Sequence, residues 1–216
     1  MSTSSPPRHQ RRKEARPAEL AAAALSLFVE KGFAATRLDE VAARAGVSKG
    51  TLYLYFDSKE ALFRAVIEGS VVPLVEQSEA RIEALKHDPE RLLRETLVNW
   101  WFNFGATELG GICKLMISEA GNFPEVAAYY NEAVIVRWMG LLGRVLELGM
   151  DKGVFRRLNV DILRQQVFFP LLMQSVWKNS LAGCCAPAAL PDSYFDTYFD
   201  LVFRGLLAAP PLEPSR

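Results

Sequence analysis

Cysteine and histidine are scarce in this chain, which holds three cysteines and two histidines among 216 residues. The cysteines are Cys113, Cys184 and Cys185, and no C-x-x-C spacing occurs, so the sequence predicts reduced thiols rather than a disulfide framework. His9 and His87 do not stand in a metal-ligand spacing, and we therefore expect no metal site. A thiol sensor built on the cysteines stays open as an alternative.

Long apolar runs are also missing. No stretch approaches the ~20 apolar residues that span a bilayer, which excludes a membrane-spanning helix. The Ala- and Leu-rich residues 18–29 follow a basic stretch, as in a secretion signal, but Glu19 interrupts them and Glu30 closes them. We expect a soluble, cytoplasmic protein without a membrane partner.

Patterns of catalytic residues are absent as well. The sequence carries no Ser/His/Asp set, no Gly-rich phosphate loop and no paired carboxylates in a candidate pocket. We therefore expect neither an enzyme nor a bound cofactor.

The net charge is zero, but the charges are unevenly distributed. Residues 1–64 hold 11 Lys or Arg and 7 Asp or Glu, whereas the rest of the chain holds 14 and 18. A basic front and an acidic body indicate that a polyanion meets the front.

Helical spacing is present throughout, and strand-like alternation is not. Leu20, Ala23, Ala24, Leu27 and Phe28, for example, fall on one face of a helix. The sequence predicts an all-α fold of about nine helices, over residues 17–31, 38–45, 49–55, 58–86, 89–106, 112–120, 124–152, 161–182 and 191–208. Because Pro73 stands inside the fourth of these, we expect a kink near Val72.

Residues 37–56 have the pattern of two short helices joined by a tight turn. Thr36 with Asp39 predicts a capping box for the first helix, and Ser48 predicts a cap for the second. Gly46 suits the turn, which needs a positive φ. Apolar residues at helical spacing build the unit: Val41, Val47, Leu52 and Phe56.

Polar and aromatic residues around this turn are left free to contact DNA. A recognition helix uses mainly its N-terminal residues, where Lys49 can donate to guanine or phosphate and Thr51 can touch a thymine methyl. The complete set of DNA-binding candidates is Thr36, Arg37, Ser48, Lys49, Gly50, Thr51, Tyr53, Tyr55 and Lys59. On spacing alone, an ordinary pair of packed helices is an equal alternative.

Residues 17–63 resemble the DNA-binding domain of the tetracycline-repressor (TetR) family of bacterial regulators. The resemblance rests on L-F-x-E-K-G-F-x-x-T (27–36), V-A-x-x-A-G-V-S-K-G-T-L-Y-x-Y-F (41–56) and S-K-E-x-L-F (58–63). It implies a homodimer whose two recognition helices enter successive major grooves of a palindromic operator. It also implies a C-terminal domain that binds a small molecule and releases the DNA, as a repressor does.

The resemblance divides the chain into three parts. Residues 1–13 are expected to be a disordered basic arm, residues 14–74 the helix-turn-helix DNA-binding domain, and residues 75–210 the effector-binding and dimerisation domain. The surplus of apolar residues in 161–182 and 191–208 fits the dimer interface that the family places there.

The C-terminal domain is rich in large apolar side chains, which are either core or the lining of a ligand site. We expect an apolar or aromatic effector held by Trp100, Phe104, Met116, Tyr130, Trp138 and Trp177. The alternative is a regulator whose C-terminal domain binds a protein partner or senses oxidation; a fully packed core without a cavity would favour the partner.

Overall fold

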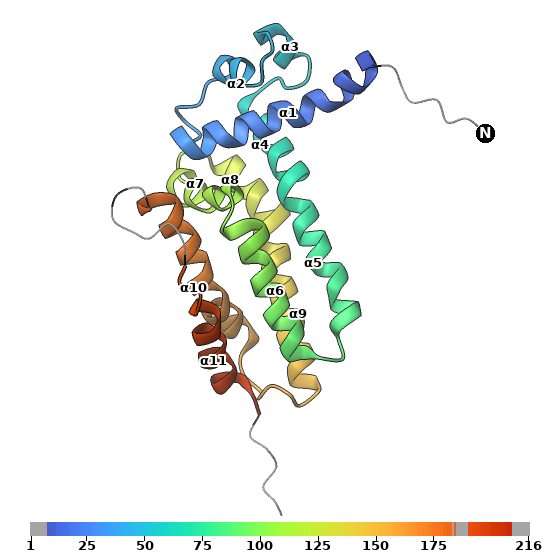
Figure 1. Cartoon of the computed structure of the whole chain (residues 1–216), viewed down its shortest axis with the longest axis vertical. Helices are drawn as coiled ribbons and strands as arrows, with labels where there is room; N and C mark the ends of the chain where they lie inside the picture. The colour runs from blue at the N-terminus through green and yellow to red at the C-terminus, as the bar shows by residue number, and fades with distance from the viewer. Residues whose placement is uncertain (1–7, 183, 185–189, 209–216) are drawn as a thin grey trace, which may run out of the picture.

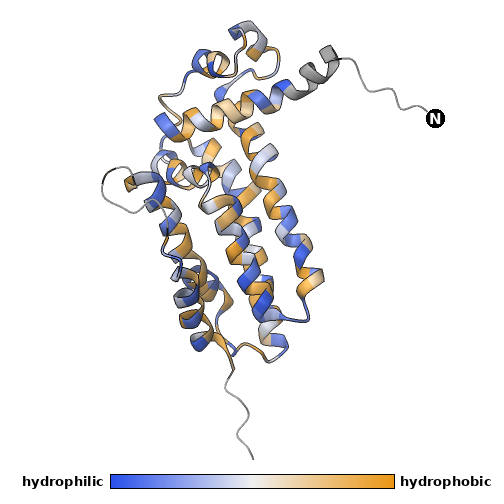
Figure 2. Cartoon of the chain, viewed as in Figure 1, coloured by the Kyte–Doolittle hydropathy of each residue, from blue (hydrophilic) through white to orange (hydrophobic). Residues whose placement is uncertain are grey.

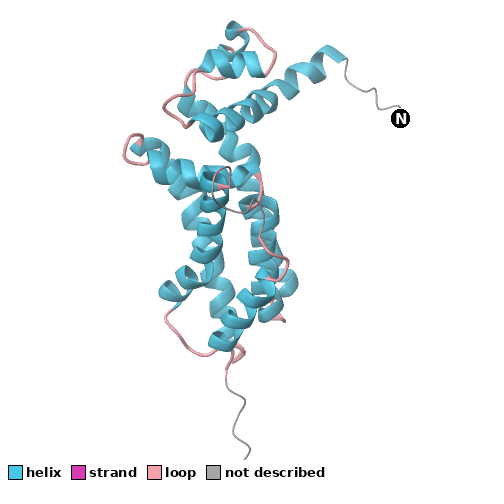
Figure 3. Cartoon of the chain, turned by 60° about the vertical axis from the view of Figure 1, so that its left-hand side comes forward, coloured by secondary structure: helices cyan, strands magenta, loops and turns pink. Residues whose placement is uncertain are grey.

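The computed structural model describes residues 8–182, 184 and 190–208, with side chains from residue 16 onward. Within these residues the chain forms helices and no strand (Figure 3), apart from an isolated bridge between Phe155 and Leu207. The α-helices are α1 (Arg8–Lys31), α2 (Leu38–Arg44), α3 (Lys49–Tyr53), α4 (Lys59–Val66), α5 (Val72–Leu85), α6 (Pro89–Trp100), α7 (Gly111–Glu119), α8 (Pro124–Tyr130), α9 (Arg137–Asp151), α10 (Val160–Leu181) and α11 (Tyr194–Leu206). None of them is both long enough and apolar enough to cross a membrane.

Four shorter helical segments connect some of these helices. They are the π-helical turns η1 (Ile67–Val71), η2 (Trp101–Gly105) and η4 (Asn131–Val136) and the 3-10 turn η3 (Glu108–Gly110). The π-turns join α4 to α5, extend α6, and join α8 to α9 without a loop. Because α4 and α5 are continuous, and α8 and α9 are too, the eleven described α-helices form nine continuous segments, as predicted. The break expected near Val72 is the π-turn η1.

The first helix begins earlier than predicted. It starts at Arg8 rather than Pro17, so the part of the expected disordered arm from residue 8 onward is helical, while residues 1–7 lie outside the described residues. Pro17 removes a single intrahelical donor, and the residues before it are mostly strong helix formers, which explains the longer helix.

The N-terminal head consists of α1 to α4, and α1 lies across one end of the body (Figure 1). Its centre is a cluster of three buried aromatic rings. The ring centroids of Phe28, Phe33 and Phe63 lie 5.2 to 6.0 Å apart, which is the spacing of tilted and edge-to-face pairs. Phe33 lies in the loop between α1 and α2. The cluster therefore anchors this loop, and with it the start of α2, to α1 and α4.

The body is a bundle in which α5, α6, α9 and α10 run lengthwise and α7 and α8 lie directly beneath α1 (Figure 1). Apolar and polar residues alternate along its long helices (Figure 2), so each turns an apolar face inward. The last helix, α11, packs on η2 and α10: the Phe195 ring lies 6.3 Å from Trp101, and the Tyr198 hydroxyl donates to the Val167 carbonyl.

Candidate DNA-binding surface and internal cavity

The turn between α2 and α3 has the predicted local structure. Gly46 has φ of +66°, and the Ser48 hydroxyl accepts a hydrogen bond from the Thr51 amide at 3.1 Å as the cap of α3. The capping box expected for α2 is wrong by one residue, because Arg37 is the cap and its amide donates to Glu40 at 3.4 Å. Both helices therefore start where the sequence places them.

Exposed residues on α3 form the outer surface of the head. Lys49, Gly50 and Tyr53 are exposed, and the Lys49 ammonium lies 5.9 Å from the Tyr53 ring. Leu54 is 81% exposed and was missed as a candidate. Residues two positions apart in a helix lie on different faces, so the spacing of Leu54 from the buried Leu52 indicates an exposed side chain. This spacing could have identified Leu54 from the sequence.

The other candidates differ in accessibility. Ser48 is exposed, Thr51 is half-buried, and their hydroxyl oxygens lie 2.9 Å apart. Tyr55 is half-buried against the hydrophobic core. Arg37 is exposed and pairs with Asp39 at 3.1 Å.

Two of the phosphate-binding candidates, Thr36 and Lys59, have their side chains hydrogen-bonded within the head. Thr36 is only 2% exposed, and its hydroxyl lies 2.8 Å from the Gly32 carbonyl and 3.2 Å from the Leu27 carbonyl, so it fastens the loop after α1. The Lys59 ammonium donates to the carbonyls of Phe33, Ala34 and Thr36 at 2.7, 3.0 and 3.2 Å. Because an ammonium has three donors, none is left for a phosphate.

Replacing Lys59 with Met should destabilise the fold by roughly 2 kcal/mol or more, because it removes three hydrogen bonds from a charged donor and even one such bond is worth about 1.5–3 kcal/mol. Urea unfolding followed by circular dichroism measures this. The matched control is Lys49→Met, which removes an exposed ammonium and should leave the free energy of unfolding unchanged. Equal stability of the two variants would contradict the structural role of Lys59.

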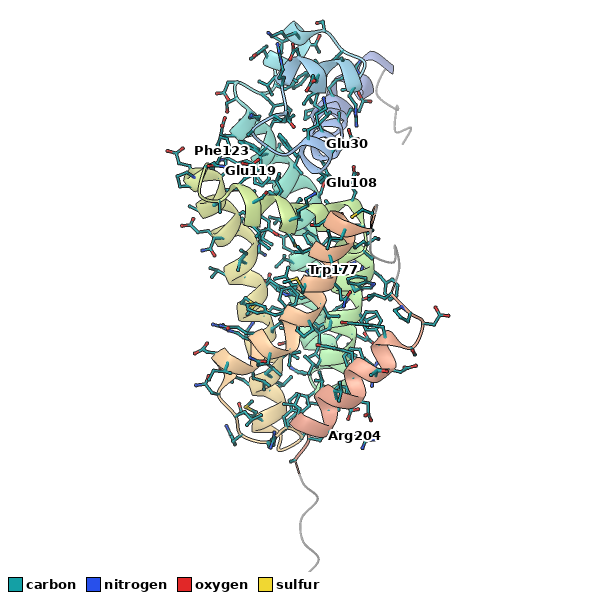
Figure 4. The ribbon with its side chains drawn as sticks, turned by 90° about the vertical axis from the view of Figure 1, so that its left-hand side faces the viewer. Glu30, Glu108, Glu119, Phe123, Trp177 and Arg204 are labelled. Carbon is teal, nitrogen blue, oxygen red and sulfur yellow. The ribbon has the colours of Figure 1, made fainter. Side chains whose placement is uncertain are left out.

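The head and the body meet through α7 and α8. The Glu119 carboxylate at the end of α7 accepts from the Ala34 amide at 3.4 Å, and the Phe123 ring packs edge-on against Phe33 at 4.7 Å. Figure 4 shows Glu119 and Phe123 at the end of the body that faces the head. The body therefore holds the same loop that Lys59 and Thr36 hold from within the head.

A second junction lies on α8. The Tyr129 hydroxyl bonds to Glu68 of η1 at 3.0 Å, and the Arg64 guanidinium of α4 lies 4.2 Å from the Tyr129 ring. Burial and the Glu68 carboxylate raise the pKa of Tyr129 to about 12, so its hydroxyl remains a donor at neutral pH.

The body contains a cavity of about 540 Å³, which is partly open to solvent. Its walls are mainly apolar and come from α5 to α10 and the π-turns between them. Five of the six predicted ligand residues line it: Trp100, Phe104, Met116, Tyr130 and Trp138. The sixth, Trp177, does not, because it lies more than one turn beyond Leu172, the last residue of α10 that lines the cavity. Trp177 is 48% exposed, and Figure 4 shows its place on α10.

All three π-turns of the described chain contribute to the cavity wall. Val71 comes from η1, Asn103 and Phe104 from η2, and Val134 and Ile135 from η4. π-turns are rare and concentrate at functional sites. The location of all three π-turns at the cavity wall supports a binding role for this cavity. The sequence did not predict these π-turns.

A buried thiol and phenol share one wall of the cavity. Burial raises the pKa of the Cys113 thiol to about 12 and holds the pKa of the neighbouring Tyr130 hydroxyl well above its usual value. Both groups are therefore protonated at neutral pH and offer hydrogen bonds rather than negative charge.

Comparison with known proteins relates the whole chain to one family. The model of the bacterial regulatory proteins of the tetR family matches residues 20–66. The HTH-type transcriptional repressor KstR2 of Rhodococcus jostii is 37% identical over 201 residues, which cover 90% of this chain and 92% of KstR2.

Two solved structures share the fold. The fatty acid degradation regulator FadR from Bacillus halodurans has a TM-score of 0.71 at 21% identity, with 94% of this chain and 97% of that chain covered. FadR from Bacillus subtilis in complex with stearoyl-CoA has a TM-score of 0.69 at 20% identity, covering 87% and 98%. With the helix-turn-helix head and the extent of the KstR2 match, these findings show that the chain belongs to the TetR family of DNA-binding transcriptional regulators.

Proposed function

We propose that this chain is a repressor that leaves a palindromic operator when a small apolar or aromatic effector enters the cavity. The observation that carries the proposal is the cavity itself, about 540 Å³ with mainly apolar walls and a few polar groups. Sites of this size and composition typically hold small molecules. Two relatives support it: R. jostii KstR2 is a repressor, and B. subtilis FadR holds stearoyl-CoA on the same fold.

The two alternatives have less support. A fully packed body without a cavity would favour a protein partner, and the presence of the cavity is evidence against this alternative. Oxidation sensing requires a reactive thiolate, whereas Cys113 is buried with a pKa of about 12. Cys184 is exposed and does not line the cavity, and Cys185 lies outside the described residues.

The proposal includes a homodimer formed through α10 and α11. Four large apolar residues are exposed on α10 although they recur at helical spacing: Ile162, Phe169, Met173 and Trp177. They share one face of the helix, and Leu201 adds an exposed apolar residue on α11. A contiguous exposed apolar stripe is characteristic of an interface between chains. Val167, Phe168 and Leu171 on the same helix are buried in the core.

Two helices, α7 and α8, connect the cavity to the head. Met116 of α7 lines the cavity, and the same helix ends at Glu119 on the Ala34 amide. Tyr130 of α8 lines the cavity, and its neighbour Tyr129 bonds to Glu68. An effector that shifts α7 or α8 therefore moves the heads, whose recognition helices must stay about 34 Å apart in the dimer. A coupling of about 1–3 kcal/mol weakens DNA binding about 5–150-fold.

A release assay tests the proposal. A palindrome selected from random DNA with the wild-type protein is labelled, and its affinity is measured by fluorescence anisotropy with and without a library of apolar compounds. At least one compound should weaken binding about 5-fold or more. Sedimentation of the free protein at micromolar concentration should show a dimer.

A matched pair of variants assigns the response to the cavity. Met139 lines the cavity and Glu147 is exposed on the same helix, α9. Met139→Trp should keep DNA binding and lose the response, and Glu147→Trp should keep both. A full response in Met139→Trp, or no active compound with the wild type, would count against this function.

A further inference from the structure

Two buried nitrogen donors in the cavity wall lack a hydrogen-bond partner. They are Nε1 of Trp138 and Nε of Arg164, and no other buried side-chain nitrogen or oxygen in the described part of the chain is unpaired. Both residues line the cavity, and Trp138 is only 5% exposed. Buried polar groups are almost always paired, so two orphaned donors on residues of the cavity wall point to a partner that the protein itself does not supply.

The remaining donors of Arg164 anchor its head group. Nη1 donates to the Met139 carbonyl at 3.4 Å, and Nη2 pairs with the exposed Asp161 at 2.8 Å. The Met139 contact holds the guanidinium beside the residue that follows Trp138. Phe168, one turn after Arg164, lies 5.6 Å from the Trp138 ring. Both orphaned donors therefore lie where α9 packs against α10.

The charge of the cavity wall indicates which kind of group pairs with them. Among the described residues that line the cavity, Arg164 is the one charged side chain, and its neighbours include the amide Gln165. Indole and guanidinium N–H groups only donate, so the partner must be an acceptor. A guanidinium in mainly apolar surroundings favours an anionic acceptor, since charge-assisted hydrogen bonds are roughly twice as strong as neutral ones.

We infer that the effector is an apolar organic acid whose carboxylate accepts hydrogen bonds from Trp138 Nε1 and Arg164 Nε, an inference that rests on the proposed function. The aromatic rings of Trp100, Phe104 and Phe168 hold its apolar part. A protonated amine in the same position could not accept a hydrogen bond from either donor.

Three probes that differ in one group test this inference: 1-pyrenebutyrate, its methyl ester and 1-pyrenebutylamine. Their affinities for the full chain are measured by fluorescence titration and checked by calorimetry. The acid should bind about 10-fold or more tightly than the ester and the amine. Trp138→Phe, which keeps an aromatic ring, and Arg164→Met should each remove most of this advantage and leave the ester unchanged.

The control is Trp101→Phe, which removes a buried indole outside the cavity lining and should keep the preference for the acid. Equal binding of the three probes, a preference for the amine, or an acid preference unaffected by both cavity variants would overturn the inference. So would failure of all three to bind. The release assay with neutral compounds decides the proposed function separately, because it needs no carboxylate.

Discussion

A Lys49→Met variant should bind the operator about 30-fold or more weakly while unfolding like the wild type. Lys49 is the first residue of α3 and is exposed, with its ammonium beside the Tyr53 ring. Loss of one contact to a base costs about 1–3 kcal/mol, and a dimer repeats the loss in both half-sites, which makes about 2–6 kcal/mol. Met has a similar length, so the variant removes the charge and keeps most of the packing on Tyr53.

Anisotropy titrations at several salt concentrations measure the effect and assign its cause. If Lys49 binds phosphate, the salt dependence should decrease by about one counterion per half-site; if it reads a base, sequence preference should relax instead. Lys86→Met is the control, because Lys86 is exposed and pairs with Glu83 near the far end of α5. Wild-type affinity in the Lys49 variant would remove the start of α3 from the interface.

The helix-turn-helix could be predicted in detail because its determinants are local. Gly46 supplies the positive φ of the turn, and Ser48 caps an amide three residues away. Such effects depend on residue type and short spacing, which a sequence displays directly. The number of helices was predictable for the same reason, since apolar periodicity and proline positions mark each of them.

The roles of Thr36 and Lys59 could not be predicted because their partners are distant in sequence. Thr36 contacts the carbonyl of Leu27, and Lys59 reaches the carbonyl of Phe33, 26 residues away. A threonine and a lysine beside a helix-turn-helix have the chemistry of phosphate ligands, and only the packed head reveals that carbonyls already occupy them.

The cavity was only partly predictable. Aromatic residues in the body indicated a ligand site, and five of the six candidates do line one cavity. Trp177 was included on residue type alone, and it lies more than one turn beyond Leu172, the last residue of α10 in the cavity wall. The orphaned donor of Arg164 carried no sequence signal, because its other partners are the Met139 carbonyl and a nearby aspartate.

A large loss of stability is expected for Gly110→Ala. Gly110 has ordinary helical angles, φ of −59° and ψ of −23°, so alanine causes no backbone strain there. Its Cβ, however, would lie 2.4 Å from the Gly105 carbonyl oxygen and 2.5 Å from the Ser175 hydroxyl. These two groups bond to each other at 2.8 Å and join η2 to α10, so neither can move without separating them.

We expect Gly110→Ala to lower the free energy of unfolding by roughly 3 kcal/mol, the upper part of the range for overpacking. That corresponds to a decrease in melting temperature of about 6–12 °C for a chain of this length. Thermal unfolding followed by circular dichroism, at one protein concentration because a dimer's melting temperature depends on it, measures the change.

Gly140→Ala is the matched control and should have the opposite sign. Gly140 lies inside α9, and a Cβ there would meet no atom within 4 Å. The alanine should therefore stabilise the helix by about 0.4–1 kcal/mol, because it reduces the entropy of the unfolded chain. Since both substitutions add the same methyl group at helical angles, their difference isolates the close approach of η2, η3 and α10. A neutral or stabilising Gly110→Ala would mean that η2, η3 and α10 can separate at little cost. The cavity wall that η2 and α10 share would then be far more deformable than the contacts around Ser175 imply.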